Sequence, residues 1–265
     1  MSAVTQVGRQ FRFTNKSFWR NPASAFFTFA FPLMFLVIFT SLLGSGEVVI
    51  NGVPIDIATY YVGAIAAFGV VSACFTNIAI STTFNRDAGI LKRLRGTPLP
   101  AGAYMGARVL HAMVVGAILV IITLSFGALA YDSPIPTGTP LLEFIAAFLV
   151  GSLSFAALAL ALTAVIPNAE AAPPIVNAAI LPLLFISGIF IPLGDDAPAW
   201  ITTVGDIFPV KPFADAMRAG FLGNLTTPEG VRAIPFEWMD VAIIAAWGIA
   251  GLVLAARFFS WEPRR

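Results

Sequence analysis

The sequence has few charged residues, one cysteine and one histidine. Only 11% of its 265 residues are Asp, Glu, Lys or Arg, whereas 58% are hydrophobic and the mean hydropathy is +0.88. A soluble domain carries about 25% charged residues, so the composition excludes an ordinary soluble protein. The single Cys74 and the single His111 exclude a disulfide framework and a metal site made of several Cys or His ligands. Lipid is therefore the expected solvent for most of this chain.

Six apolar runs are long enough for a membrane-spanning helix, which needs about 20 residues. The first run is longer than the apolar core of a signal peptide and no small-residue cleavage pattern follows it, so we interpret it as a span. We expect an all-α polytopic membrane protein in which residues 1–265 form one domain with six transmembrane helices. The predicted spans are residues 24–43, 57–80, 103–130, 141–166, 174–193 and 239–259.

Basic residues are concentrated on one side of this predicted topology. Twelve of the 15 Lys and Arg residues lie before the first span, between the second and third spans, at the start of the third, or at the C-terminus. Since Lys and Arg are enriched in cytoplasmic loops, both termini are expected in the cytoplasm. The 12 Arg against three Lys, together with abundant Ala and Gly, indicate a GC-rich bacterial source and hence a multi-pass protein of the bacterial cytoplasmic membrane.

Residues that carry chemistry are scarce within the spans. No Asp, Glu or Lys lies away from the span ends, so the chain lacks the groups with which a secondary transporter couples ions to substrate. Arg108 and His111 fall near the cytoplasmic end of the third span, where an arginine can extend to the interface. For His111, packing is favoured over a proton relay. No lysine follows a glycine, so a phosphate-binding loop is absent and the energy for pumping would come from a separate subunit.

Residues 1–22 form the first of two cytoplasmic segments large enough to bind such a subunit. At 100° per residue, a helix here would separate an apolar face from a basic one. A basic amphipathic helix next to a span is typical of a helix that lies in the membrane interface, and an ordinary positively charged flank is the alternative. The apolar face would hold Val4, Val7, Phe11 and Phe18, and the basic face Arg9, Lys16 and Arg20, with Arg12 at its flank.

The second cytoplasmic segment is a predicted capped helix over residues 85–95. Asn85 is a favourable N-cap, and Asp87 would follow in the first turn, where the helix dipole favours an acid. Gly96 would end the helix. A short helix with one apolar side fits a groove on a partner protein, and a charged loop that only sets topology is the alternative. The apolar side consists of Ile90, Leu91 and Leu94.

Three motifs occur in a set order relative to the spans. The loop motif contains Arg86, Gly89, Leu91, Leu94, Thr97, Pro98 and Leu99; the second is residues 187–193, Ser-Gly-Ile-Phe-Ile-Pro-Leu, with Pro198, Ala199 and Trp200; the third is Pro209 with Ala216, Met217 and Arg218. In these motifs the chain resembles the membrane subunits of ABC-2 type transporters, also called type V ABC exporters, and among these it is most similar to daunorubicin-type drug-resistance permeases.

The resemblance implies roles for specific positions. Residues 1–22 would be an interface helix and residues 85–95 a coupling helix, both contacting an ATP-binding subunit. Residues 198–222 would form two short external helices that re-enter the membrane as a lid, with simple packing against the spans as the alternative. The coupling residues would be Arg86, Gly89, Ile90, Leu91, Leu94, Arg95, Thr97 and Pro98; the interface residues Val7, Arg9, Phe11, Arg12, Lys16 and Phe18; and the path or lid residues Phe35, Ser187, Phe190, Pro192, Trp200 and Phe208.

The same resemblance implies a permease subunit of an ATP-binding-cassette exporter rather than an enzyme. Two copies of an ATP-binding subunit would hold ATP and magnesium, and a second permease copy or paralogue would complete the membrane part, surrounded by lipid. No catalytic, cofactor-binding or metal-binding residue and no nucleic-acid partner are expected in this chain. Apolar spans with sparse neutral polar residues suit export of an amphipathic drug or lipid-like small molecule. Polysaccharide or glycolipid export is the alternative, and a secondary carrier or channel and an intramembrane enzyme are the competing classes.

Overall fold

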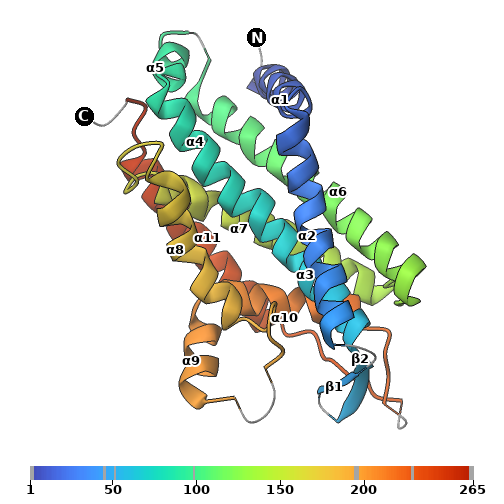
Figure 1. Cartoon of the computed structure of the whole chain (residues 1–265). Coiled ribbons are helices and arrows are strands. Elements are labelled where there is room, and N and C mark those ends of the chain that lie inside the picture. Colours follow the sequence, from blue (N-terminus) through green and yellow to red (C-terminus); the bar gives the residue numbers. More distant parts are fainter. Residues whose placement is uncertain are drawn as a thin grey trace.

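The computed structural model describes residues 3–43, 46–50, 52–97, 99–193, 197–227 and 230–262 and is built mainly of helices (Figure 1). A π-helical turn, η1, lies between α3 and α4. The elements are α1 (Ala3–Trp19), α2 (Pro22–Leu43), β1 (Glu47–Ile50), β2 (Val53–Asp56), α3 (Ile57–Val71), η1 (Ser72–Thr76), α4 (Asn77–Asp87), α5 (Ile90–Arg95), α6 (Ala101–Tyr131), α7 (Thr139–Leu162), α8 (Ala172–Phe185), α9 (Ala199–Ile207), α10 (Val210–Phe221) and α11 (Trp238–Phe258).

Within the described residues, five helical segments are long and apolar enough to cross a membrane. They are α2, the continuous rod of α3, η1 and α4, α6, α7 and α11. Together they confirm the expected all-α polytopic membrane protein. The rod continues to Asp87 instead of ending near residue 80; at 1.5 Å per residue its 31 residues extend about 46 Å, which exceeds a hydrocarbon layer of about 30 Å.

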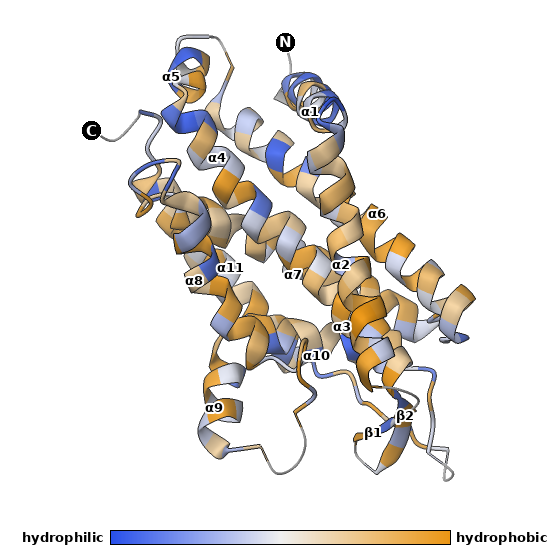
Figure 2. Cartoon of the chain, in the orientation of Figure 1, coloured by the Kyte–Doolittle hydropathy of each residue, from blue (hydrophilic) through white to orange (hydrophobic). Residues whose placement is uncertain are grey.

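The rod is the centre of the bundle. All residues from Thr59 to Val71 are buried, and α2, α6, α7 and α10 pack around them. By contrast, α2 buries only one side, and large apolar residues such as Phe26, Phe27 and Leu42 are exposed on it. Its ribbon is mainly in the hydrophobic colours (Figure 2). Such an outer surface is expected of a helix whose other neighbours are lipid or a second membrane protein.

Helices α7 and α11 approach each other closely because glycine faces the neighbouring backbone. A Cβ atom at Gly248 of α11 would lie 2.3 Å from the Ser154 hydroxyl of α7, and one at Gly251 would lie 2.8 Å from the backbone nitrogen of Leu158. Small residues permit this approach between membrane helices, where close packing replaces the hydrophobic effect as the main attraction.

The predicted fifth span, residues 174–193, is wrong as a continuous helix. The helix α8 ends at Phe185, and its 14 residues extend about 21 Å, which is too short for the hydrocarbon layer. Gly188 adopts a left-handed conformation with φ of 75°, which ends the helical path. Counting apolar residues could not reveal this break, because Ile189 and the residues after it remain apolar.

The two ends of the bundle carry different elements (Figure 1). One end carries α1, α5 and the end of α11, and the other carries α9 and a β1–β2 hairpin that the sequence pattern did not predict. The pair of short helices expected over residues 198–222 corresponds to α9 and α10, which are separated at Phe208 and Pro209. The helix α10 is buried against α3, α7 and α11, whereas α9 is largely exposed, so the two do not form one surface lid.

Candidate functional site

The α4–α5 elbow contains the predicted coupling segment. The single helix expected over residues 85–95 is wrong, because α4 continues to Asp87 and α5 begins only at Ile90. Gly89 stands between them with φ of 68°, a left-handed conformation that glycine adopts without steric strain. Asn85 therefore lies in the last turns of α4 and is not an N-cap; its Nδ2 donates to the Tyr104 hydroxyl at 3.4 Å.

Arg86 is buried and ties the elbow to the end of α7. It is 2% exposed, and its guanidinium donates to the carbonyl oxygens of Thr163 at 2.8 Å and Ile166 at 2.7 Å. These carbonyls follow the last turn of α7, where backbone oxygens lack helical partners and the helix dipole favours a cation. Asp87 lies 3.5 Å from Arg86 Nε and accepts a hydrogen bond from the backbone N–H of Ala169. Arg86 therefore links two parts of this chain instead of offering a charge to a partner's surface.

The other predicted coupling residues divide between the interior and the surface. Leu91 is completely buried and Leu94 is half-buried, so the apolar side expected to enter a partner's groove packs mainly inward. Pro98 and the side chain of Arg95 lie outside the described residues. The exposed side chains of the elbow are Ile90, Lys92, Arg93 and Thr97.

The predicted interface helix, α1, lies against α6 through one face. Phe11 and Phe18 are half-buried, and their rings lie edge-to-face against His111 of α6 with centroid separations of 6.3 and 5.3 Å. Val7 is also half-buried, whereas Val4 on the same predicted face is 81% exposed. The opposite side offers basic groups to a partner or to lipid headgroups. These are Arg9, Arg12 and Lys16.

Phe190 joins the break after α8 to α2 and α3. Its ring stacks on Phe35 at 5.5 Å and lies 5.2 Å from Phe68 and 5.3 Å from Phe185. Each such aromatic pair contributes about 0.5–1.5 kcal/mol beyond its buried area. Two of the predicted path or lid residues, Phe35 and Phe190, are thus brought together.

The remaining four predicted path residues are divided between the break and two other places. Ser187, completely buried, and Pro192, half-buried, lie in the same break as Phe190. Phe208 stacks on Trp247 of α11 at 5.5 Å, and Trp200 is exposed on α9. The six residues therefore do not line one surface.

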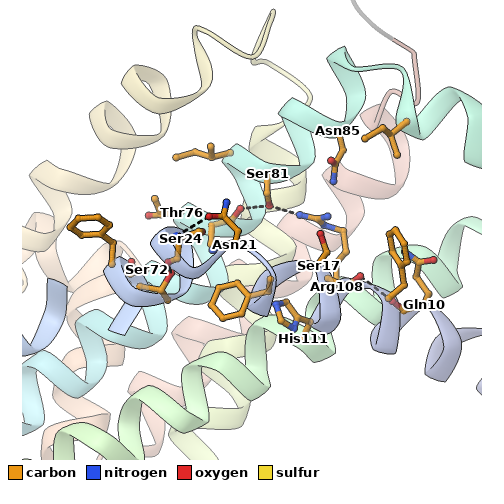
Figure 3. Close-up of a pocket in the computed structure, with 18 of the residues that line it drawn as sticks. Gln10, Ser17, Asn21, Ser24, Ser72, Thr76, Ser81, Asn85, Arg108 and His111 are labelled. Atoms are coloured by element: carbon orange, nitrogen blue, oxygen red, sulfur yellow. Dashed lines mark hydrogen bonds between the residues drawn. The ribbon is translucent and has the colours of Figure 1, made fainter. Parts of the chain in front are cut away.

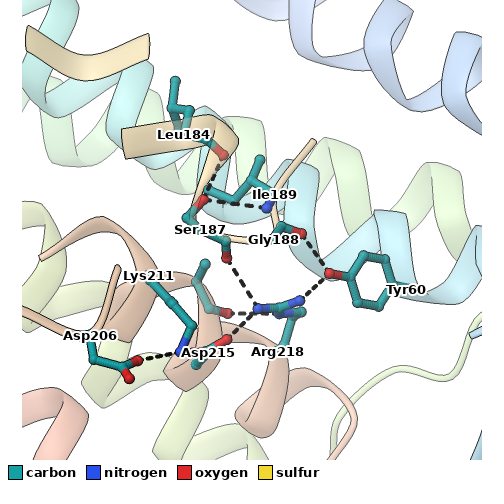
Figure 4. A network of polar contacts seen from close by, with 10 residues as sticks. Tyr60, Leu184, Ser187, Gly188, Ile189, Asp206, Lys211, Asp215 and Arg218 are labelled. Atoms are coloured by element: carbon teal, nitrogen blue, oxygen red, sulfur yellow. Dashed lines mark hydrogen bonds and ion pairs between the residues drawn. The ribbon is translucent and has the colours of Figure 1, made fainter. Parts of the chain in front are cut away.

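A buried arginine, Arg218, forms several polar contacts near the break after α8 (Figure 4). The sequence analysis included this residue in a motif but assigned it no role. Arg218 of α10 is 9% exposed and forms an ion pair with Asp215. Its guanidinium also donates to the hydroxyl of Tyr60 on α3 and to the carbonyl of Ser187, the latter at 3.4 Å. A buried cation is tolerated when it is paired and hydrogen-bonded, so these contacts stabilise the position of α10 against α3.

Two adjacent tyrosines in the rod donate hydrogen bonds to backbone carbonyls of the break that follows α8. The Tyr60 hydroxyl donates to the carbonyl of Gly188, and the Tyr61 hydroxyl donates to the carbonyl of Phe190 at 2.9 Å. Irregular backbone at membrane depth needs partners from within the protein. Two consecutive tyrosines inside an apolar run could have indicated buried hydrogen bonds. The sequence alone could not show which groups they bind.

Lys211 extends the Arg218 cluster toward α9. Its ammonium pairs with Asp206 and lies 3.3 Å from a carboxylate oxygen of Asp215. Burial alone would lower the pKa of this ammonium, but Asp215 and Asp206 outweigh that effect and raise the pKa above its ordinary value. Lys211 therefore stays charged and holds α9 to α10.

A cavity of about 1000 Å³ lies beside the elbow, between α1, α2, η1, α4, α5 and α6 (Figure 3). Its wall combines hydroxyl and amide groups with aromatic side chains. Ser24 of α2, Ser72 of η1 and Arg108 of α6 line it. Ile90 and Leu94 of α5 also line it, so the cavity extends to the α5 end of the bundle.

The comparisons with known proteins agree with this arrangement. Within the described residues, no group of three or more His, Cys, Asp or Glu side chains is placed to hold a metal ion. A family model described as ABC-2 type transporter matches residues 5–222, which include α1, the elbow and α10. A comparison with curated proteins finds no match. The family model covers most of the chain and is one of transport components that pair with an ABC ATP-binding subunit. The chain therefore belongs to the ABC-2 type transporter family, as a membrane permease subunit of an ABC exporter.

Proposed function

We propose that this permease exports an amphipathic drug, a lipid-like molecule or a related compound of the daunorubicin-permease kind across a bacterial cytoplasmic membrane. It works with two copies of the ATP-binding subunit and with a second permease copy or paralogue. The end that carries α1 and α5 faces the cytoplasm, because exposed basic residues of both helices gather there. ATP and magnesium bind to the partner subunit, and this chain contributes the path.

The Arg86 link is the observation that carries this proposal. The exposed side chains of α5 and α1 offer a docking surface, whereas Arg86 behind them is bonded to the end of α7. Force applied to the elbow by a closing ATPase would therefore pass into the α7–α8 connection. A merely topological loop has no need of a buried, multiply bonded arginine.

The rod holds α8 at both of its ends. Arg86 and Asp87 bind the connection that precedes α8, and Tyr60 and Tyr61 bind the break that follows it. Rigid elements with discrete contacts at each end are the usual carriers of coupling between distant sites. A displacement of the elbow thus moves α8 as a body, and the exposed apolar sides of α2 and α8 are free to meet a second permease copy.

Replacing the exposed side of the elbow tests the assignment. The double variant Ile90→Asp/Arg93→Glu is expected to lose co-purification with the ATP-binding subunit, because both side chains are exposed on α5. Val231→Asp is the matched control, since Val231 is an exposed apolar residue in the α10–α11 connection, whose Arg232 pairs with Glu143 at the other end of α7. Unchanged assembly and ATP turnover in the double variant would contradict the proposal.

Transport is measured with inside-out vesicles that contain the complete complex. ATP is expected to drive uptake of daunorubicin, followed by its fluorescence, and vesicles without the ATP-binding subunit are expected to show none. Accumulation against a gradient by this chain alone would instead establish a secondary carrier.

A further inference from the structure

The cavity beside the elbow contains a buried cation without an acidic partner (Figure 3). Arg108 is 9% exposed, and its guanidinium donates to the hydroxyls of Ser81 and Tyr104, the latter at 3.2 Å. Across the residues that the structure describes, no carboxylate lies within ion-pair distance of Arg108, and no acidic side chain lines the cavity. Neutral hydroxyls satisfy some of its hydrogen-bond donors and its Cζ atom lies 5.7 Å from the centroid of the Tyr104 ring, but no opposite charge faces it among the described residues.

Other arginines of this chain show how it treats a buried guanidinium. A buried charge without an opposite charge is unfavourable by several kcal/mol, and arginine does not escape this by losing its proton. Arg108 therefore lacks the opposite charge that the other arginines have, and an anion from outside the chain would supply it. The buried pairs are Arg86 with Asp87 and Arg218 with Asp215, and the half-buried Arg232 likewise pairs with Glu143.

His111 adds a second unsatisfied polar group to the same wall. It lies three residues after Arg108, on the same face of α6, and both side chains line the cavity. His111 is 7% exposed, and its Nδ1 atom is buried with no hydrogen-bond partner among the described residues. A neutral imidazole donates through one ring nitrogen, and because Nδ1 has no exposed surface, the donor to an anionic oxygen in the cavity is Nε2. The two side chains therefore form one anion-binding corner.

The cavity also has an apolar side that opens outward. Phe27 and Phe31 of α2 line it and are 64% and 44% exposed, and Ile80 of α4 adds a third apolar contact. Because the outer side of α2 is apolar, a ligand can enter this side from lipid (Figure 2). The volume of about 1000 Å³ is at the upper end of small-molecule sites and is far larger than an inorganic anion needs.

We propose that this cavity binds an amphiphile with an anionic headgroup, which ion-pairs with Arg108 and accepts a hydrogen bond from His111 while its apolar part lies along Phe27 and Phe31. The π-helical turn η1 contributes Ser72 and Thr76 to the wall, and such turns occur often at functional sites. The ligand enters from the membrane leaflet beside α5. The choice of membrane leaflet rests on the proposed function, which places the α5 end in the cytoplasm. The binding itself does not, because it needs no ATP-binding subunit.

Binding of short-chain phosphatidylglycerol to the purified chain in a neutral detergent tests the site, with phosphatidylcholine of equal chain length and inorganic phosphate as comparison ligands. Phosphatidylglycerol is expected to bind at least tenfold more tightly than either. Arg108→Gln is expected to weaken its binding by about 10- to 100-fold, the range for losing a hydrogen bond to a charged group. Arg257→Gln removes an exposed charge from the last turn of α11 at the same end of the bundle and is expected to leave the affinity unchanged.

A second variant keeps the test decisive if Arg108→Gln disturbs folding. Thr76→Phe fills the cavity without removing a charge and is expected to abolish phosphatidylglycerol binding. Equal affinity for both lipids, phosphate binding as tight as lipid binding, or wild-type affinity in folded Thr76→Phe would overturn the proposal.

Vesicles that contain the whole complex distinguish an amphiphile that is transported from one that stays bound as a resident lipid. ATP-driven movement of a fluorescent phosphatidylglycerol identifies the ligand as cargo, and retention during ATP turnover identifies it as a resident lipid; either result supports the site. Failure of daunorubicin transport with intact lipid binding would contradict the proposed function alone.

Discussion

Replacing Arg86 separates docking of the ATP-binding subunit from transmission of its movement. In Arg86→Met the side chain keeps most of its apolar length but loses its charge and all of its donors. The carbonyls of Thr163 and Ile166 lose their charged donor, and Asp87 loses its neighbouring cation. Because Arg86 is 2% exposed, the docking surface itself is unchanged.

The expected magnitude follows from those contacts. Arg86 also donates to a third carbonyl, that of Pro167, at 3.2 Å. A hydrogen bond to a charged group contributes about 1.5–3 kcal/mol, so loss of the two shorter bonds alone weakens the link by about 3–6 kcal/mol. This agrees with the roughly 3–5 kcal/mol for removing one partner of a buried ion pair. Since 1.4 kcal/mol already corresponds to a factor of ten, we expect transport per ATP hydrolysed to fall about tenfold or more. Arg86→Lys keeps the charge without the planar fork, and an intermediate loss is expected.

The assay combines co-purification of the ATP-binding subunit, ATP turnover, and ATP-driven daunorubicin uptake in vesicles. Arg86→Met is expected to retain the subunit while its uptake becomes uncoupled from turnover. A folded variant with unchanged uptake per ATP would show that the link transmits nothing. A variant that loses the subunit while its unfolding is unchanged would place Arg86 at the docking surface and refute the reasoning.

Two further predictions concern stability. Leu91→Asp puts a charge in a completely buried position and is expected to lower the unfolding temperature in detergent strongly, whereas exposed Ile90→Asp leaves it nearly unchanged; similar values for both would contradict the inward packing of α5. Gly248→Val drives a side chain into Ser154 of α7 and is expected to lower the free energy of unfolding by about 1–3 kcal/mol. The control Gly102→Val has open space around it, and equal stability of the two variants would contradict close α7–α11 packing.

Part of the fold could be predicted from the sequence because lipid imposes a simple rule. A helix must be apolar over about 20 residues to cross the hydrocarbon, and this rule located the five long spans, although the rod continues seven residues beyond its predicted end at residue 80. It failed for α8, where the apolar run continues through Gly188 but the helix does not. The break depends on Tyr60 and Tyr61, which lie more than a hundred residues away in the chain and satisfy its carbonyls.

Motifs located the candidate site without showing how its side chains point. The segment around Arg86 and Leu91 was predicted to face a partner, yet both side chains are buried inside the chain. Helical periodicity groups residues on a face and does not reveal which neighbour covers that face. The apolar stripe of α1 was easier to predict, since the opposite side is basic and only one face can pack against α6.

By itself, the sequence determined that this is a membrane protein, roughly where its long helices cross the bilayer, and which family it resembles. These properties follow from composition and local order along the chain. Only the tertiary structure decided that Arg86 holds the end of α7, that the rod holds α8 at both ends, and that Arg108 has no ion-pair partner among the described residues. Such outcomes depend on which distant groups meet, because the free energy of a buried charge or carbonyl is set by its partners and not by its position in the sequence.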